Sequence, residues 1–310
     1  MKLRIGTRGS ALARAQTAYV ARRLEALGHA TEVMIISTSG DRRTDRAFAE
    51  IGSFGIFVRE IEAALVDGRI DVAVHSFKDL PSRGTAGLVV AAVPERLDAA
   101  DVLVAREDAI VSDHELIPLG AGLRVGTAAV RRQALLRHFR PDLAPGLLRG
   151  NVPTRLRTLA EGTFDAIILA AAGLARLAGA DAPHGETLPP GTRAVRLDPS
   201  RFVPAPAQGA IAVQVRESAQ TIRDAVAHID DEHLSRAMRA ERQALTLAEG
   251  GCSLPFGAWC CADDAGMLTL HAVLGANDGS LARAMVRGHD PDALASTAWR
   301  ELESTVRAPT

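Results

Sequence analysis

Two short segments of this sequence each occur twice, and in the same order. Residues 3–7 (LRIGT) recur at 123–127 as LRVGT, and residues 68–74 (GRIDVAV) resemble 162–168 (GTFDAII). The first segment is typical of a short strand that leads into a helix, and the second of a helix stop followed by a buried strand. The repeated order predicts two similarly built α/β lobes, the first beginning at residue 1 and the second near residue 100. Their sites should correspond, at the carboxyl ends of the strands and facing a shared crevice.

Hydrophobic periodicity predicts strands that alternate with helices, which is typical of a parallel or mixed α/β sheet. A helix is expected over residues 10–27, with Ser10 as its N-cap and Gly28 as its stop. Residues 203–210 (VPAPAQGA) are expected to form a linker or crossing segment, beyond which the pattern becomes that of a small α+β third domain. The other expected elements are strands at 3–6, 32–37, 70–74 and 211–215, helices at about 56–66, 232–247 and 292–306, and a hairpin of strands 268–274 and 281–286.

The composition is that of a folded protein. The 310 residues are 47% hydrophobic and begin with a strand-like segment rather than a secretion signal. No apolar run approaches the ~20 residues that a membrane span needs, so we expect a cytoplasmic protein. The formal net charge of −1 gives no electrostatic reason to expect nucleic acid or an anionic membrane as a partner.

Three cysteines do not form the pattern of a disulfide framework or a zinc site, and no metal is expected. Cys260 and Cys261 follow Trp259 in an expected strand and are interpreted as core residues. Cys252 instead follows two glycines in a loop after a helix, where a thiol can serve as a nucleophile or as an attachment point. A small buried apolar residue is the alternative for this position.

Arginines cluster in three loops that each precede a helix: Arg8 in the first, Arg131 and Arg132 in the second, and Arg149 and Arg155 in the third. The N–H groups at a helix N-terminus already favour an anion, and the planar arginine fork binds carboxylates through two hydrogen bonds. The second pair falls in a first helical turn, against the helix dipole, so an anion or carboxylate should compensate it. The three loops together predict a substrate with several carboxylates, whereas each arginine alone is also consistent with a solvated surface residue.

Residues 75–79 (HSFKD) directly follow an apolar strand, which places polar side chains where sites usually lie in an α/β sheet. Asp79 is a candidate general acid or base, or a group that stabilises a developing cation. The alternative is a turn-capping aspartate beside a solvated Lys78. His75 is interpreted as a structural hydrogen-bonding group rather than a base.

In their order, these segments resemble the porphobilinogen deaminase (hydroxymethylbilane synthase) family over nearly the whole chain. No single segment is specific, whereas the ordered set is. The segments that carry the resemblance are Gly6, Thr7, Arg8 and Ser10; 57–60 (FVRE); 71–76 (DVAVHS) with Lys78 and Asp79; Gly126 and Thr127 with 131–133 (RRQ); 148–152 (LRGNV) with Thr154 and Arg155; 165–170 (DAIILA) with 172–174 (AGL); 208–210 (QGA); and 249–252 (EGGC).

The resemblance implies a discontinuous α/β lobe at 1–98 and 199–216, a second α/β lobe at 99–198, and an α+β domain at 217–310 that carries the cofactor cysteine. The lobes are expected to resemble type II periplasmic binding proteins, with the active site in the cleft between them. A dipyrromethane cofactor, itself made from substrate, is expected to be joined to Cys252 by a thioether. Four porphobilinogen units are then added in turn with loss of ammonia, and hydrolysis releases the linear hydroxymethylbilane.

Position in the family pattern also implies roles for single residues. Asp79 is expected to contact pyrrole N–H groups and to stabilise the azafulvenium-like cation formed as the amine leaves. Cofactor binding is expected of Cys252, Lys78, Ser76, Thr127, Arg131 and Arg132. Binding of the substrate acetate and propionate groups is expected of Arg8, Ser10, Gln16, Arg149, Arg155 and Arg176.

The sequence departs from the family pattern at a few positions. Ala128 and Ala129 stand where some members have two serines, and Phe54 stands where a lysine sometimes occurs. Pro153 and Ala207 stand where glycine is frequent. These changes put individual carboxylate contacts in question but not the chemistry.

Two other functions are open at this stage: a cytoplasmic binding protein for a polycarboxylate ligand, and an inactive paralogue that keeps the fold. The expected absence of an export signal and the third domain with Cys252 argue against a solute-binding protein. The family resemblance further implies a monomer, and its product is expected to pass to uroporphyrinogen III synthase.

Overall fold

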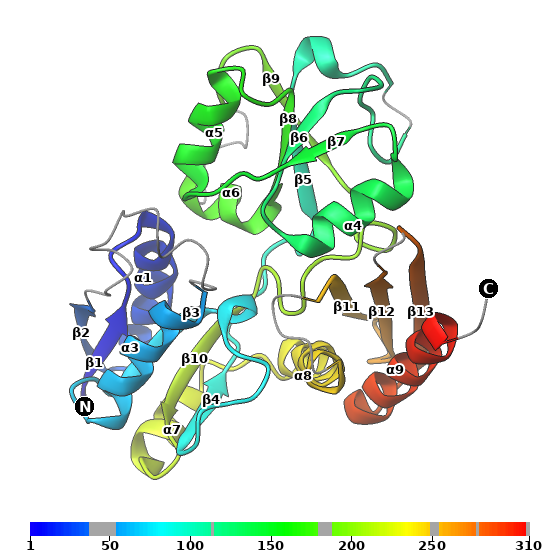
Figure 1. The fold of residues 1–310 in the computed structure, drawn as a ribbon. Helices are drawn as coiled ribbons and strands as arrows, with labels where there is room; N and C mark the ends of the chain where they lie inside the picture. The colour runs from blue at the N-terminus through cyan, green and yellow to red at the C-terminus, as the bar shows by residue number, and fades with distance from the viewer. Residues whose placement is uncertain (37–53, 113–114, 179–187, 249–253, 277–278, 308–310) are drawn as a thin grey trace. The chain divides into compact units, whose positions relative to one another are not determined.

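A computed structural model of the chain describes residues 1–36, 54–112, 115–178, 188–248, 254–276 and 279–307. These residues form two five-stranded mixed sheets and one three-stranded sheet, with helices against their faces (Figure 1). The chain divides into two compact units, Met1–Arg96 with Gly209–Ser235, and Leu97–Gln208 with Arg236–Thr310. The predicted class, two similar α/β lobes and a small α+β part, is confirmed. The bounds of the three domains stay a prediction.

The first lobe contains a sheet in the order β2-β1-β3-β10-β4. Its first three strands are parallel, and β10 is antiparallel to both of its neighbours. The elements of this lobe are β1 (Lys2–Thr7), α1 (Ala11–Ala26), β2 (Ala30–Ile35), α3 (Phe54–Val66), β3 (Val72–Ser76), the 3-10 turn η2 (Phe77–Asp79), β4 (Leu88–Ala92), β10 (Ile211–Arg216) and α7 (Gln220–Ala227).

The second lobe repeats this plan with a sheet in the order β7-β6-β8-β5-β9, in which β5 is the antiparallel strand. The two repeated segments pair in the same register in both lobes: Ile5 lies opposite Val72 in one, and Val125 lies opposite Ala166 in the other. The elements are β5 (Asp101–Arg106), η3 (Glu107–Ala109), β6 (Arg124–Gly126), α4 (Val130–Phe139), β7 (Ala144–Gly146), α5 (Val152–Ala160), β8 (Ala166–Ala170), α6 (Ala171–Ala178) and β9 (Thr192–Arg196).

Helices cover both faces of each sheet. In the first lobe Val20 and Leu24 of α1 pack in one apolar cluster, and Ile61 and Leu65 of α3 in another. In the second lobe α4 contributes to one cluster, and α5 and α6 to the other. Strands enclosed on both faces read as continuous apolar runs, which is why residues 166–169 of β8 are all buried.

An arginine–aspartate clamp closes the amino end of the first sheet. The Arg4 N–H and guanidinium donate to the Asp71 carboxylate at 2.8 to 3.0 Å, and Nη2 also donates to the carbonyl of Gly68 at 2.7 Å. Arg216, at the end of β10, places Nη2 3.7 Å from Asp71 Oδ1. The hydrogen bond from Arg4 lowers the pKa of Asp71, although partial burial opposes that shift.

The second sheet carries the same clamp at the equivalent positions. Arg124 N–H donates to Asp165 Oδ2 at 2.8 Å, and Arg124 Nη2 donates to the carbonyl of Gly162 at 3.0 Å. Arg106, at the end of β5, places Nη2 3.9 Å from Asp165 Oδ1. Since β5 and β10 occupy the same place in their sheets, the internal repeat extends from the sequence to the ion pairs that fasten the strands.

The repeated glycine before each threonine is a packing requirement. A Cβ on Gly6 would collide with Ile70, and a Cβ on Gly126 would lie 3.0 Å from Phe164. Ile70 and Phe164 are equivalent residues of the second repeat. The large side chain on one repeat therefore requires the glycine on the other.

The small α+β part comprises α8 (Glu232–Leu247), the antiparallel strands β11 (Phe256–Ala262), β12 (Leu268–Gly275) and β13 (Leu281–Gly288), and α9 (Pro291–Arg307). Leu294, Ala298 and Leu302 of α9 are buried on this helix, which packs against β12 and β13. At Gly275 the sheet approaches α4 so closely that a Cβ would lie 2.7 Å from that of Ala134.

The structure corrects several details of the sequence analysis. Strand β3 begins at Val72 and not at residue 70, because the N–H of Ile70 donates to Ala64 at the end of α3. Strand β2 begins at Ala30 because that N–H donates to Met1 and extends the parallel ladder. Cys260 is buried as expected, but Cys261 is half-exposed, since neighbouring residues of a strand face opposite sides.

Among the described helices, none combines the length and the apolar character that a membrane span needs.

The clamp predicts a pH-dependent contribution to stability. Asp71→Asn should lower the free energy of unfolding at pH 7 by about 2 kcal/mol, the range for hydrogen bonds to charged groups. Because the folded-state pKa of Asp71 is lowered, its contribution is present above the unfolded pKa of about 3.9 and is lost as the pH falls through the folded pKa. Urea unfolding at several pH values measures both effects. The control is Asp67→Asn at an exposed pair with Arg69, and an equal loss in that variant would contradict a specific clamp.

Candidate active site

Six side chains singled out from the sequence lie in the first lobe, at the last residue of β3 or in the segments that follow β1 and β3, which are neighbouring parallel strands. Parallel strands end at the same edge of a sheet, so these side chains share the carboxyl edge, opposite the clamp. We call them the first-lobe cluster: Arg8, Ser10, Gln16, Ser76, Lys78 and Asp79.

A buried amide is the best-defined part of the first-lobe cluster. Gln16 is 2% exposed, and its Oε1 accepts a hydrogen bond of 3.0 Å from the hydroxyl of Ser76. Its Nε2 is buried and has no acceptor within the described part of the chain. A buried donor without an acceptor costs about 1–3 kcal/mol, so this atom suits a carboxylate or carbonyl of a ligand. Ser10 caps α1 by accepting from the N–H of Ala13, as predicted.

Asp79 ends the short turn η2 directly after β3. Burial raises the pKa of Asp79 above its usual range, and the nearby charges of Lys78 and Arg8 oppose that rise. The three charged groups are thus close enough to influence one another. His75 lies buried in β3, and desolvation lowers its pKa to about 4, which keeps it neutral near pH 7 and agrees with a structural role.

The second-lobe cluster comprises the remaining predicted site residues that the structure describes. These residues follow β6, β7 and β8, adjacent parallel strands whose carboxyl ends share one edge of the second sheet, and Arg176 lies further along, in the last turn of α6. They are Thr127, Arg131, Arg132, Arg149, Arg155 and Arg176.

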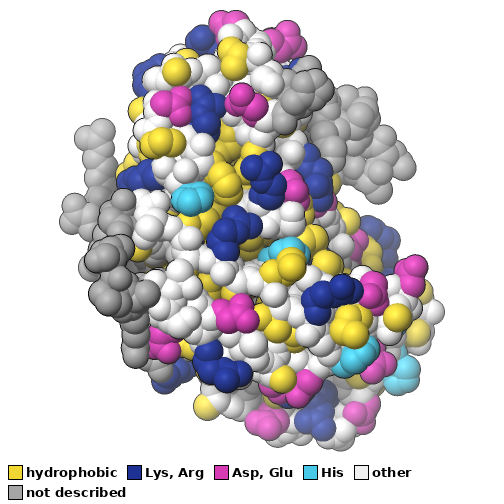
Figure 2. All heavy atoms as spheres, turned by 90° about the vertical axis from the view of Figure 1, so that its right-hand side faces the viewer, with side chains coloured by type: hydrophobic (Ala, Val, Ile, Leu, Met, Phe, Trp, Pro, Cys, Tyr) yellow, Lys and Arg dark blue, Asp and Glu magenta, His cyan; other side chains and the backbone are white. Residues whose placement is uncertain are grey.

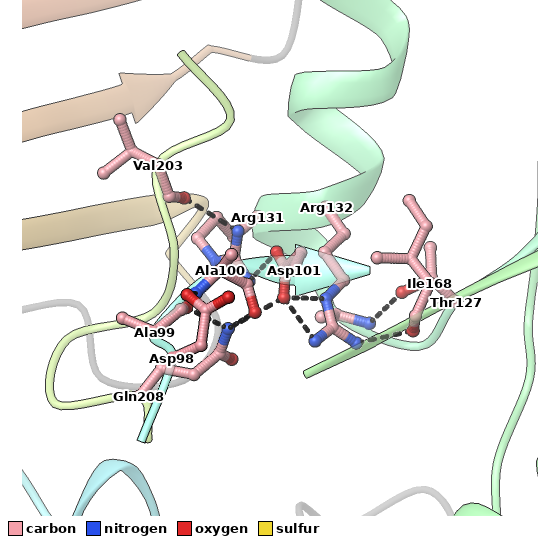
Figure 3. A network of polar contacts seen from close by, with 11 residues as sticks. Asp98, Ala99, Ala100, Asp101, Thr127, Arg131, Arg132, Ile168, Val203 and Gln208 are labelled. Atoms are coloured by element: carbon pink, nitrogen blue, oxygen red, sulfur yellow. Dashed lines mark hydrogen bonds and ion pairs between the residues drawn. The ribbon is translucent and has the colours of Figure 1, made fainter. Parts of the chain in front are cut away.

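A buried aspartate holds the arginine pair (Figure 3). Asp101, at the start of β5, is 0% exposed, with Oδ2 2.8 Å from Nη2 of Arg131 and Oδ1 2.7 Å from Nη2 of Arg132. Gln208 Nε2 donates to the same Oδ1 at 2.9 Å. Burial by itself would raise the pKa of Asp101, but the two guanidinium charges and these hydrogen bonds hold it well below the usual range. The carboxylate that the sequence required opposite a cationic first helical turn is therefore Asp101.

Positive charge nevertheless remains in excess around Asp101. Burial lowers the pKa of Arg155, and the charge of Arg132 lowers it further, which places these two cations within range of each other. Arg155 Nε donates to the carbonyl of Gly150 at 2.8 Å. In the described group of Asp101, Arg131, Arg132 and Arg155, guanidinium groups outnumber the carboxylate, which favours an anionic ligand.

On the face drawn in Figure 2, basic and acidic side chains are interspersed, with hydrophobic side chains between them. Such mixing agrees with the net charge of −1 and produces no extended field of one sign over that face.

Several departures from the family pattern have a structural explanation. Ala129 is the N-cap of α4 and makes no side-chain cap, but its N–H donates to the hydroxyl of the buried Thr127 at 3.3 Å. Pro153 lies in the first turn of α5, where its missing N–H is not needed and Asn151 provides the cap. Ala207 has a φ of +60°, a region that favours glycine. Cys252 and the side chain of Phe54 lie outside the described residues.

Sequence reasoning missed Asp101 and Gln208 as partners of the arginine pair. The sequence predicted that an anion lies beside Arg131 and Arg132, but it did not identify the residue that supplies the anion. Asp101 begins β5 and lies 31 residues before Arg132 of α4 in the chain.

Two protein-family models together match most of the chain. The model of the porphobilinogen deaminase, dipyromethane cofactor binding domain, matches residues 3–224, and that of the porphobilinogen deaminase C-terminal domain matches residues 235–303. The chain belongs to the porphobilinogen deaminase family. A porphobilinogen deaminase of Syntrophobacter fumaroxidans is 40% identical over 99% of this chain and 98% of its own, and one of Deinococcus deserti is 45% identical over 89% and 86%.

Solved structures give more distant likenesses. An ancestral cationic amino acid solute-binding protein is 13% identical with a TM-score of 0.45, over 74% of this chain and 87% of its own. The substrate-binding protein of an amino acid ABC transporter is 15% identical with a TM-score of 0.39, over 74% and 91%. Membership of the porphobilinogen deaminase family makes the protein an enzyme with a dipyrromethane cofactor domain, and it supports this function over a polycarboxylate-binding protein or an inactive paralogue.

The buried pair predicts a large effect of a small substitution. Asp101→Asn leaves two buried guanidinium groups without their counter-ion, and breaking such a pair costs about 3–5 kcal/mol. Chemical denaturation should show this loss. Glu32→Gln, at the exposed pair with Lys2, should cost much less. Equal small losses in both variants would contradict the assigned role of Asp101.

Proposed function

We propose that the protein joins four porphobilinogen units in turn, with release of one ammonia per unit, on a dipyrromethane cofactor bound by a thioether to Cys252. Hydrolysis then frees the linear hydroxymethylbilane. The observation that carries this proposal is the group around Asp101, in which guanidinium groups outnumber the carboxylate and so suit a chain of carboxylated pyrroles in a member of this family.

The described residues fit the cofactor. A dipyrromethane carries carboxylates and pyrrole N–H groups, so it needs cations and a carboxylate acceptor, and the two clusters contain both. Lys78 and Ser76 in the first lobe and Thr127, Arg131 and Arg132 in the second would hold it. When bound, it supplies the pyrrole carbon to which the first substrate unit is joined.

The remaining cations would bind substrate. Each porphobilinogen brings an acetate and a propionate, so the site must neutralise a growing polyanion, and arginine matches carboxylate geometry through two parallel hydrogen bonds. The buried Nε2 of Gln16 adds a neutral donor. We assign these groups to Arg8, Ser10, Gln16, Arg149, Arg155 and Arg176.

Asp79 is the proposed catalytic group. Positive charge develops on the substrate ring as ammonia leaves, and a partly desolvated carboxylate stabilises such a charge more strongly than one in water does. Asp79 must be ionised for this purpose. Lys78 and Arg8 assist by opposing the rise in its pKa that burial causes.

We further propose that the protein acts as a monomer in the cytoplasm and that its product passes to uroporphyrinogen III synthase. The family resemblance supports these statements.

The raised pKa of Asp79 predicts the acid limb of the pH profile. Activity should fall on acidification at a pH above the ordinary aspartate value of about 3.9. Lys78→Gln should move this limb to higher pH, because it removes a charge that lowers the pKa of Asp79. The control is Arg83→Gln. Arg83 is an exposed arginine four residues after Asp79 in the chain, and its substitution should leave the limb in place. A limb unmoved by Lys78→Gln would count against Asp79 as the titrating group.

The thioether predicts a covalent mass on Cys252. Intact-protein mass spectrometry of the purified chain should find an excess equal to two pyrrole units, which disappears in Cys252→Ser. Cys261→Ser, at the half-exposed thiol of β11, is the matched control and should keep the excess. A fully active protein without added mass would refute the proposed function.

A further inference from the structure

Residues 203–208 form a buried segment that we call the strap, and it connects several parts of the second unit. Val203 and Ala207 are 0% exposed and Gln208 is 1% exposed. The carbonyl of Pro204 accepts from the N–H of Ala258 in β11 at 3.0 Å. A Cβ on Gly257 would lie 2.8 Å from the carbonyl oxygen of Val203, so the strap and β11 are in backbone contact.

Glu241 fixes one side of the strap. This carboxylate on α8 is 0% exposed, and its two oxygens accept from two different backbone N–H groups, each at 2.6 Å. Oε1 accepts from Cys260 in β11, and Oε2 accepts from Ala207 in the strap. A single side chain therefore joins α8, β11 and the strap. In the sequence, α8 and β11 are the elements on either side of Cys252.

The backbone of Ala207 makes this contact specific. Its φ of +60° is the only positive value at a described non-glycine residue. An alanine in this conformation costs about 1–2 kcal/mol and persists only where its surroundings require it. The hydrogen bond to Glu241 is such a requirement, because it holds the N–H of Ala207 in one direction.

The other side of the strap holds the arginine pair. Gln208 donates from Nε2 to Asp101 Oδ1 at 2.9 Å and to the carbonyl of Ala99 at 2.8 Å (Figure 3). The carbonyl of Val203 accepts from Nη1 of Arg131 at 2.8 Å. The strap thus contacts both the carboxylate and one of the cations of the group described above.

We propose that Glu241 is a positioning residue of the cofactor site: it sets the conformation of the strap and, through Gln208 and Val203, the placement of Asp101 and the arginine pair. In its relation to the cofactor this inference rests on the proposed function. A misplacement of about 1 Å caused by a distant mutation can cost about 100-fold in rate, which gives such a residue its importance. The alternative is that Glu241 only joins β11 to α8.

Hydrogen exchange in the full-length Cys252→Ser chain separates these two roles without any bound cofactor. Glu241→Gln keeps the shape of the side chain but sets an NH2 group against a backbone N–H. We expect amide exchange to quicken at least tenfold in residues 97–105 and in α4, as well as in β11. Leu302→Ala is the control for a general loss of stability. It removes a buried side chain of α9, which packs on the same sheet, and should lower the free energy of unfolding by about 2–5 kcal/mol without quickening exchange in residues 97–105. Faster exchange confined to α8 and β11 in Glu241→Gln would overturn the proposal.

A double-mutant cycle with Cys252 intact tests the route through the strap. Glu241→Gln and Gln208→Met should each lower the fraction of folded protein that carries the cofactor mass at least threefold. In the double variant this fraction should be no lower than in the more strongly affected single variant, because both changes break the same connection through the strap. If the fold losses of the two single variants instead multiply in the double variant, the route through the strap is contradicted. A wild-type chain without the mass would refute the proposed function, whereas the exchange result would still decide the role of Glu241.

Discussion

The second lobe depends on the charge of one buried carboxylate. Arg131 and Arg132 lie in the first turn of α4, where the helix dipole disfavours cations, and both are nearly buried. Asp101 compensates them at 2.8 and 2.7 Å, and its pKa is held so low that it stays ionised throughout the physiological range. Because Arg155 adds a further cation, the compensation is incomplete. Incomplete compensation leaves positive charge that suits an anionic ligand.

The two lobes share a plan but divide the chemistry. Each fastens the amino end of its sheet with the same arginine–aspartate clamp, Arg4 with Asp71 and Arg124 with Asp165, and this leaves the carboxyl end for function. At that end the first lobe presents a carboxylate of raised pKa, and the second presents uncompensated cations. The pattern suits a reaction that needs one cation-stabilising group and many carboxylate-binding groups.

Features that depend on neighbouring residues could be predicted from the sequence, whereas pairings between distant residues could not. The Ser10 cap, the helix from residue 232 to 247 and the repeat were readable because each depends on neighbouring residues. The start of β3 was not, because a hydrogen bond to α3 removes Ile70 from the ladder. The clusters could be assigned to strand ends from sequence order alone. Contacts between distant segments could not be predicted. Ala207 and Glu241, for example, are 34 residues apart and meet only in the folded chain.

The central claim is that uncompensated charge beside Asp101 binds the growing polycarboxylate. Arg155→Leu tests it most directly, with Arg157→Leu, an exposed position on the same helix, as its pair. Intact-mass analysis during turnover should show Arg155→Leu stalled with partial chains at discrete mass steps, while Arg157→Leu matches the wild type. Identical mass patterns and turnover in both variants and the wild type would contradict the account.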